Sequence, residues 1–204
     1  MKVADVIRKY DLAKHPEGGY FKETLRLPTQ ICQLGHDGQM TGEVFSAGTS
    51  IYYLLEHESK GEFSAWHKLS GLDETWNYHF GATMTIYWIE PSGQLIMKKL
   101  GMDDDAFLQV HVPRDRWFSA VVDGENSEAF TLVGCTVFPG FNFDRFELAN
   151  RESLSTSFPQ HSDIISRFTR PNSCVPLRFV DGSSIPSSRA DGSIPANKNI
   201  QQPY

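Results

Sequence analysis

The stretch Gly61-Glu-Phe-Ser-Ala-Trp-His67-Lys-Leu-Ser-Gly-Leu-Asp-Glu74-Thr-Trp-Asn-Tyr-His-Phe-Gly81 alternates apolar or aromatic residues with polar ones on both sides of a Ser-Gly pair. This alternation is typical of β-strands, and a Ser-Gly pair between two such runs predicts a tight hairpin. In that hairpin, His67 and Glu74 would meet across the ladder. An imidazole beside a carboxylate can bind a divalent metal or act as a general base with its orienting partner. We therefore take His67 and Glu74 as candidate catalytic residues and as candidate metal ligands.

Aromatic residues predict an apolar wall around this pair. Phe63, Trp76 and Tyr78 share its strand parity, so they would face the same side of the sheet. Two alternatives remain open: the pair can be a solvated cross-strand contact, and the aromatic residues can be ordinary barrel core. The residues that we expect to contact a ligand are Tyr52, Phe63, Trp76, Tyr78, Phe118, Phe141 and Phe143.

The rest of the chain predicts an all-β sandwich or barrel, because many short β-type runs follow at close spacing. A short amphipathic helix is expected at 2–10, a helical segment interrupted by Pro159 at 152–168, and a Gly-rich loop at 32–47. We expect a single domain at 1–171 and a polar Ser/Pro/Gly-rich tail at 172–204, flexible or docked on a partner subunit. The predicted strands are 20–26, 49–56, 64–69, 75–80, 83–90, 94–99, 109–112, 117–122 and 130–137.

The composition excludes several partners. The chain of 204 residues has a formal net charge of −6 and no long run of Lys and Arg, so we expect no nucleic acid polymer as partner. Its longest apolar runs are far shorter than the roughly 20 residues that span a bilayer, and the polar start lacks the apolar segment of a secretory signal. We therefore expect a cytoplasmic protein without membrane contact. Three widely spaced cysteines, Cys32, Cys135 and Cys174, are expected to be reduced thiols.

The spacing of the 61–81 stretch resembles the first motif of the cupin superfamily, G(x)5HxH(x)4E(x)6G. Gly61, His67, Glu74 and Gly81 occupy the fixed positions, and Leu69 stands where typical cupins have a second metal-binding histidine. The second cupin motif is present only in part. Its proline is kept at 113, but Asp115 replaces a glycine and Phe118 replaces the last metal-binding histidine.

More specifically, the chain resembles the uncharacterised Cupin-5 branch, whose members are similar to the dTDP-4-dehydrorhamnose 3,5-epimerase type of cupin. The resemblance covers residues 1 to about 171. It implies a double-stranded β-helix, or jelly-roll barrel, with a ligand cavity at one mouth and a homodimeric assembly. The motifs that carry it are His15-Pro-Glu-Gly-Gly-Tyr-Phe-Lys-Glu-Thr24, Ser50-Ile-Tyr-Tyr-Leu-Leu55, Asp73-Glu-Thr-Trp76 and Leu132-Val-Gly-Cys-Thr-Val-Phe-Pro-Gly-Phe141-Asn-Phe143.

Three functional hypotheses follow from these residues. In the first, the barrel binds a small polar metabolite, a nucleotide or sugar nucleotide, and acts as an epimerase or isomerase with His67 as base and Glu74 or another carboxylate as its orienter. The acid would be a tyrosine, with Tyr52, Tyr53 and Tyr78 all eligible. In the second, the protein is a metal-dependent enzyme of the dioxygenase kind. In the third, it is a non-catalytic binding module. A tight metal site needs three or four protein ligands, and only two remain, so no cofactor is assigned and a divalent metal is the weaker alternative.

The remaining polar motifs are expected to be structural. His79 has the opposite strand parity to Glu74 and should face away from the cavity. Glu17-Gly18-Gly19 predicts a turn that needs positive φ, and one of Lys22 and Glu23 should reach the cavity rim. Asp103-Asp104-Asp105 is expected to be a solvated turn. The other histidines, at 15, 36, 57, 111 and 161, are expected at the surface or in capping positions.

Overall fold

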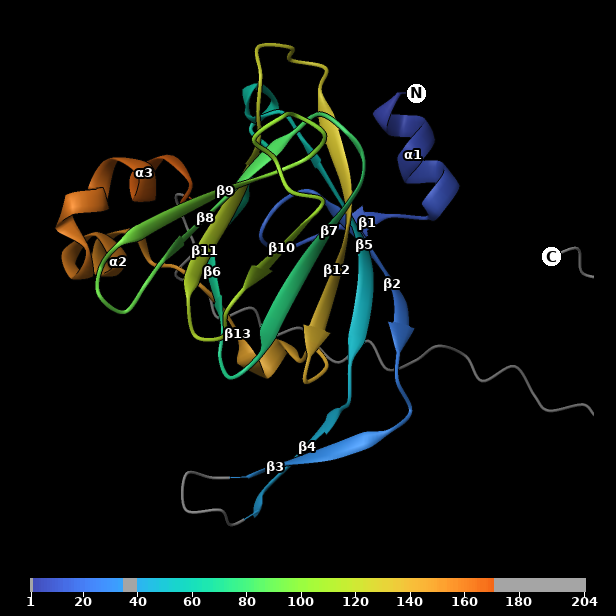
Figure 1. Cartoon of the computed structure of the whole chain (residues 1–204), viewed down its shortest axis with the longest axis vertical. Coiled ribbons are helices and arrows are strands. Elements are labelled where there is room, and N and C mark those ends of the chain that lie inside the picture. The colour runs from blue at the N-terminus through green and yellow to red at the C-terminus, as the bar shows by residue number, and fades with distance from the viewer. Residues whose placement is uncertain (1, 35–39, 171–204) are drawn as a thin grey trace, which may run out of the picture. The chain divides into compact units, whose positions relative to one another are not determined.

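The computed structural model describes residues 2–34 and 40–170, which form a barrel of two antiparallel sheets with short flanking helices (Figure 1). One sheet has the strand order β1-β2-β5-β12-β7-β10, and the other has the order β13-β6-β11-β8-β9. The expected all-β jelly roll is confirmed. The first sheet consists of β1 (Ala13–Lys14), β2 (Tyr20–Arg26), β5 (Thr49–Glu56), β12 (Phe130–Phe138), β7 (Asp73–Gly81) and β10 (Gln109–Val112). The second consists of β13 (Phe146–Leu148), β6 (Ser64–Leu69), β11 (Trp117–Val122), β8 (Met84–Ile89) and β9 (Leu95–Leu100).

The main core lies between the two sheets, because the inward side chains of both belong to one buried cluster. Tyr53 and Trp76 come from the first sheet, whereas Leu69, Ile86 and Phe118 come from the second. Each of these side chains is almost inaccessible to solvent. Removing such large apolar surfaces from water is the main favourable term in folding. Because the alternating pattern places apolar side chains on the inner face of each sheet, their burial holds the two sheets together.

The hairpin predicted for 61–81 is wrong. β6 pairs with β11 and β13, whereas β7 pairs with β12 and β10, so the two strands belong to different sheets. The link between them contains Leu72, which is buried in the core between the sheets. Burying Leu69, Leu72 and Trp76 in one core requires the chain to cross from one sheet to the other.

The loop predicted at 32–47 is also wrong over most of its length. β3 (Gln30–Leu34) and β4 (Met40–Ser46) form a separate two-stranded ribbon that extends away from the barrel (Figure 1). Ile31 lies opposite Phe45, and Cys32 lies opposite Val44. The polar and glycine content of this segment concealed the short apolar alternation that supports pairing.

The flanking helices agree with expectation. α1 (Val3–Tyr10) buries Val6 against Leu54 and Leu132 of the first sheet. At the other end, α2 (Arg151–Ser157), the 3-10 turn η3 (Pro159–His161) and α3 (Ser162–Arg167) cover Trp66, and Pro159 separates the two helices as predicted. A second 3-10 turn, η1 (Glu58–Lys60), precedes β6, and a third, η2 (Phe143–Arg145), precedes β13. The predicted tail at 172–204 lies outside the described residues, so its character and the domain boundary stay predictions.

Candidate functional site

A cavity of about 350 Å³ lies between the sheets and reaches the base of the β3–β4 ribbon. Its inner part carries polar groups among apolar ones, and its outer part carries aromatic rings. Both His67 and Glu74 line it, although they come from opposite sheets. The inner residues are His15, Glu17, Tyr53, His67, Leu69, Glu74, Trp76 and Cys135, and the outer ones include Glu23, Arg26, Gln30, Val44, Phe141, Asn142 and Phe143.

His67 does not pair with Glu74 but with Glu17. Nε2 of His67 lies 3.1 Å from Oε2 of Glu17, and both side chains are almost completely buried. The second oxygen of Glu17 accepts a hydrogen bond of 2.9 Å from the hydroxyl of Ser64. Of the alternatives left open for the carboxylate beside the imidazole, the structure places Glu17, from the loop between β1 and β2, and not Glu74 next to His67.

The hydrogen bonds of His67 define how many protons this pair holds. Nδ1 lies 2.7 Å from the carbonyl oxygen of Ala65, which can only accept, so Nδ1 carries a hydrogen. Nε2 faces the carboxyl group of Glu17, and two acceptors without a proton between them would repel each other. One proton is therefore shared between Nε2 and Glu17, either as an imidazolium with a carboxylate or as a neutral imidazole with a carboxylic acid. In both forms the pair has no net charge.

Glu17 is positioned by the turn predicted from Glu17-Gly18-Gly19. Gly18 has φ 124° and Gly19 has φ 67°, so the positive φ expected there is confirmed. A Cβ atom on Gly18 would lie 2.1 Å from the carbonyl oxygen of Phe63, so only glycine allows this close approach. The main chain of Glu17 also accepts a hydrogen bond of 2.9 Å from the backbone N–H of Ala65, which ties the turn to β6.

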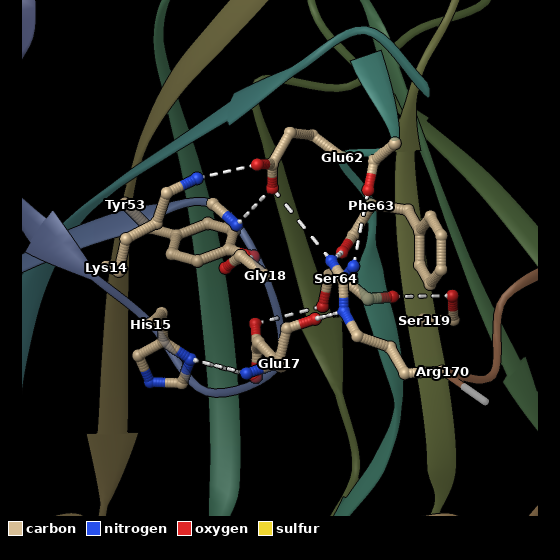
Figure 2. Close-up of polar contacts among 12 residues, drawn as sticks. Lys14, His15, Glu17, Gly18, Tyr53, Glu62, Phe63, Ser64, Ser119 and Arg170 are labelled. Atoms are coloured by element: carbon tan, nitrogen blue, oxygen red, sulfur yellow. Dashed lines mark hydrogen bonds and ion pairs between the residues drawn. The ribbon is translucent and has the colours of Figure 1, made fainter. Parts of the chain in front are cut away.

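Two further side chains hold the same turn, as Figure 2 shows. Arg170 directs its guanidinium at the carbonyl oxygens of Glu17, Gly61 and Phe63, at 3.2 to 3.4 Å. Glu62 accepts from the backbone N–H of Gly19 at 3.1 Å and from Lys14 at 2.6 Å. Residues from three distant parts of the chain thus fix the position of one carboxylate.

His15 also lines the cavity, which corrects its expected place at the surface. Its Nδ1 accepts a weak hydrogen bond from the backbone N–H of Glu17 at 3.4 Å, and its ring contacts Phe21 and Tyr53 edge-on. Burial lowers the pKa of His15, and the neighbouring Glu17 only partly offsets this effect. Nδ1 of His15 also lies 3.6 Å from Oε2 of Glu17. The lowered pKa favours the neutral imidazole.

Glu74 lies in the wall of the cavity, and its carboxyl group makes no ion pair with the Lys, Arg or His side chains of residues 2–34 and 40–170. Burial, followed by repulsion from Glu17, raises the pKa of Glu74 to about 8. The indole of Trp76 and the thiol of Cys135 lie beside the carboxyl group and offset part of this shift, although Nε1 of Trp76 has no partner at hydrogen-bond geometry among the described residues. At neutral pH, Glu74 is thus mainly a protonated acid, able to donate a hydrogen bond into the cavity.

The predicted ligand contacts divide into two groups. Trp76, Phe141 and Phe143 line the cavity. The other four are not part of its wall. Tyr52 contacts Tyr10 of α1, Phe63 packs on Phe168, and Tyr78 donates to the carbonyl of Gly81. The ring of Phe118 lies tilted against that of His67, with the ring centroids 3.9 Å apart.

The remaining candidate residues lie closer to the positions expected from the sequence. Of the eligible tyrosines only Tyr53 lines the cavity, and its hydroxyl donates to the carbonyl of Gly18 at 2.9 Å. Glu23 reaches the rim as expected, whereas Lys22 pairs with Asp11. His79 is exposed and faces away from the cavity, as parity predicts.

The donor set does not suit a tightly bound cupin metal. The positions of two typical ligands hold Leu69 and Phe118, which have no donor atoms, and Nε2 of His67 is engaged by Glu17. Within residues 2–34 and 40–170, no group of three or more His, Cys, Asp or Glu side chains is arranged to hold a metal ion. We therefore derive no step that passes through a metal.

Glu17 and His15 are the site residues that reasoning from the sequence missed. The available signal was the His15-Pro-Glu17-Gly-Gly motif, in which two ionisable residues precede a pair of glycines. Read alone, it predicts a turn. Only the approach of this turn to β6 brings its side chains into the cavity.

A double-stranded β-helix around a cavity lined by histidine and carboxylate defines the cupin class. Residues 4–149 match the family described as Cupin superfamily (DUF985), and the chain belongs to this family. An uncharacterised Saccharomyces cerevisiae protein, YML079W, is 31% identical over 148 residues, which cover 68% of this chain and 71% of the yeast protein.

Two solved structures share the fold over most of the chain. Protein SO0799 from Shewanella oneidensis is 34% identical with a TM-score of 0.71, over 84% of this chain and 99% of that one. A hypothetical protein from Leishmania major is 27% identical with a TM-score of 0.72, over 83% and 99%. These relatives confirm the family and the fold, and their names assign no activity. Among the described residues, no helix has the length and apolar character to cross a bilayer.

Proposed function

We propose that the cavity binds a small polar metabolite and catalyses a proton transfer on it, as an epimerase or isomerase does. The observation that carries this proposal is the buried contact of 3.1 Å between Nε2 of His67 and Oε2 of Glu17, in the wall of a cavity that also holds Glu74. Such a reaction needs a base that takes a proton from carbon and an acid that serves the neighbouring oxygen.

The geometry favours Glu17 as the base and His67 as its positioning residue. Both ring nitrogens of His67 already have partners, so the imidazole has no lone pair left for a substrate. The carboxylate of Glu17, held by His67 and by the hydroxyl of Ser64, can accept a proton from a carbon next to a carbonyl group. The sequence-based proposal of His67 as base is thus modified to a pair that acts together.

Glu74 is suited to be the acid. Because its pKa is raised to about 8, it carries a proton at neutral pH and can donate it, or a hydrogen bond, to the carbonyl oxygen of the substrate. The C–H bond then breaks toward Glu17 as the O–H bond forms, which gives an enol. Return of a proton to carbon, while a hydroxyl of the enol gives its proton back to the Glu74 carboxylate, gives the isomer and restores both side chains. Tyr53 is less suited because its hydroxyl is already bonded to the carbonyl of Gly18.

Deuterium incorporation from D₂O tests this proposal. A panel of neutral and phosphorylated aldoses and ketoses is incubated with the protein, and exchange at carbon is followed by NMR. We expect exchange at one carbon of at least one sugar, with a loss of at least about 100-fold in Glu17→Gln and in Glu74→Gln. Asp105→Asn, which removes an exposed carboxylate paired with Lys99, is the matched control and should leave the rate unchanged.

The same experiment separates the alternative of a non-catalytic binding module. If a sugar raises the melting temperature but no carbon exchanges, the proton-transfer proposal is contradicted and the binding module is favoured. Exchange that persists unchanged in both carboxylate variants would contradict the roles given to Glu17 and Glu74.

The expected homodimer and cytoplasmic location stay predictions. Exposed apolar side chains at Leu25, Ile31 and Val44, on β2, β3 and β4, support an interface in this region. We expect sedimentation analysis to give twice the monomer mass, and Val44→Lys to shift the protein toward the monomer. A monomer at all concentrations would contradict the homodimer.

A further inference from the structure

The electrical charge of the cavity wall limits what the cavity can bind. Eight titratable side chains line it among the described residues, and each one can be assigned a protonation state or a partner from its contacts. They are His15, Glu17, Glu23, Arg26, Tyr53, His67, Glu74 and Cys135.

At the rim, Glu23 and Arg26 neutralise each other. Nε and Nη2 of Arg26 donate to the two carboxylate oxygens of Glu23 at 3.0 and 2.7 Å, which is a two-bond pairing. The remaining nitrogen, Nη1, donates to the carbonyl oxygen of Phe141 at 3.1 Å. Arg26 is the only Lys or Arg in the described lining, and every nitrogen of its guanidinium has a partner.

In the interior, Glu17 and His67 share one proton and together have no net charge, as their contacts require. The other four groups are uncharged at neutral pH. Burial raises the pKa of Tyr53, Cys135 and Glu74, and it lowers the pKa of His15. The wall therefore contains two internally neutral pairs and four neutral groups, with no net charge left for a ligand.

We propose that the substrate is an electrically neutral polyhydroxy carbonyl compound of about monosaccharide size, rather than a phosphorylated sugar, a sugar nucleotide or an amino sugar. This inference rests on the proposed function, because it names the substrate of the same site. A phosphate would find no free cation in the described part of the lining, and a buried charge without a partner is strongly unfavourable. An ammonium group would find no free carboxylate unless it displaced the proton of Glu74 or the guanidinium of Arg26.

Size and polarity of the wall agree with such a ligand. A volume of about 350 Å³ lies at the small end of the range for small-molecule sites, roughly 300–1,000 Å³. Gln30, Ser46 and Asn142 supply uncharged polar groups, and Trp76 and Phe141 supply aromatic surfaces for the C–H faces of a ring. The sugar nucleotide expected from the sequence would carry two phosphates, which no described side chain of this wall is free to neutralise.

A matched set of ligands tests the proposal. Glucose, glucose 6-phosphate and glucosamine differ mainly in charge, and binding of each at pH 7 is measured by saturation-transfer NMR and by titration. We expect glucose to bind at least about tenfold more tightly than the two charged compounds. Tighter binding of the phosphate or of the amine would overturn the inference.

A variant at the rim sharpens this test. Glu23→Gln leaves Arg26 without its carboxylate, so the ratio of glucose 6-phosphate affinity to glucose affinity should rise about tenfold or more. Glu128→Gln removes an exposed carboxylate paired with Lys60 and should leave the ratio unchanged. An unchanged ratio in Glu23→Gln would contradict the neutralising role of this pair.

A second measurement decides the matter if none of the three compounds binds. NMR of the carboxyl carbons and imidazole nitrogens reports directly which groups carry protons at pH 7. A neutral wall requires a protonated Glu74 and one shared proton on the Glu17–His67 pair, and an ionised Glu74 would overturn the inference. Failure of deuterium exchange with this charge pattern intact would refute only the proposed reaction.

Discussion

Glu17 and His67 are in contact although they lie far apart in the sequence, with Oε2 of Glu17 placed 3.1 Å from Nε2 of His67. One residue belongs to a turn between two strands of the first sheet, and the other belongs to β6 of the second sheet. The contact therefore joins the two sheets at the inner wall of the cavity. Its burial makes it important for stability as well as for the proposed chemistry.

Removal of one partner of this pair should be strongly destabilising. In Glu17→Ala the proton-bearing His67 loses its acceptor while it stays buried, and breaking a buried pair in this way costs about 3–5 kcal/mol. The double variant Glu17→Ala/His67→Ala should lose less than the sum of the single losses, because neither charge is left alone. Urea denaturation of the three variants measures this coupling. Additive losses would show that the two side chains do not interact.

Protonation of Glu74 should appear in the pH dependence of stability. Its pKa is about 8 in the folded protein and has its ordinary value of 4.5 in the unfolded chain, so between these values the folded state binds more protons than the unfolded state. The contribution of Glu74 to the free energy of unfolding is fully present below pH 4.5 and is lost as the pH rises toward 8. The total loss is at most about 5 kcal/mol.

Comparison with Glu74→Gln isolates this effect. The variant has no proton to lose at this position. As the pH rises from about 5 to 8, the unfolding free energy of the wild type should therefore fall relative to that of the variant. Urea denaturation of both proteins at a series of pH values measures the difference. Parallel curves would contradict the raised pKa.

Arg170 should act as a positioning residue for Glu17. In Arg170→Ala the turn loses its donors to three carbonyl oxygens, so Glu17 should become mobile and the shared proton on His67 should be lost. The imidazole nitrogens of His67 observed by NMR report this change, which a loss of global stability alone would not produce below the melting temperature. Arg167→Ala, which removes a surface pair with Glu58, is the control and should leave the His67 signals unchanged.

Gly18 should be irreplaceable because a positive φ and a close approach of backbone coincide there, as they also do at Gly19 and Gly81. Gly18→Ala combines a strained φ of 124° with a Cβ atom 2.1 Å from the carbonyl oxygen of Phe63. Gly124→Ala has a similar φ of 100° but nothing within 4 Å of the new atom. The control should lose about 1–2 kcal/mol from backbone strain alone. Gly18→Ala should lose clearly more, and equal losses by thermal denaturation would contradict the close approach.

Most of the barrel could be predicted from local patterns. Strands β2, β5, β6, β10 and β11 match their predicted ranges, because alternation of apolar and polar residues is a property of each segment alone. The β3–β4 ribbon was missed because its apolar alternation is short and diluted by polar residues. The link between His67 and Glu74 was misread because a turn signal does not tell whether the chain returns in the same sheet or crosses to the other.

The sequence by itself determined the strand-rich class, the family motif, and the presence of His67, Glu74 and the aromatic residues near them. Only the tertiary structure decided which carboxylate meets the imidazole. Strand parity predicts the face on which a side chain lies, but partners across a core depend on how two sheets pack. Glu17 reaches His67 because two glycines allow its turn to lie close to β6 and Arg170 holds the turn there. No pattern within the 61–81 stretch predicts this contact.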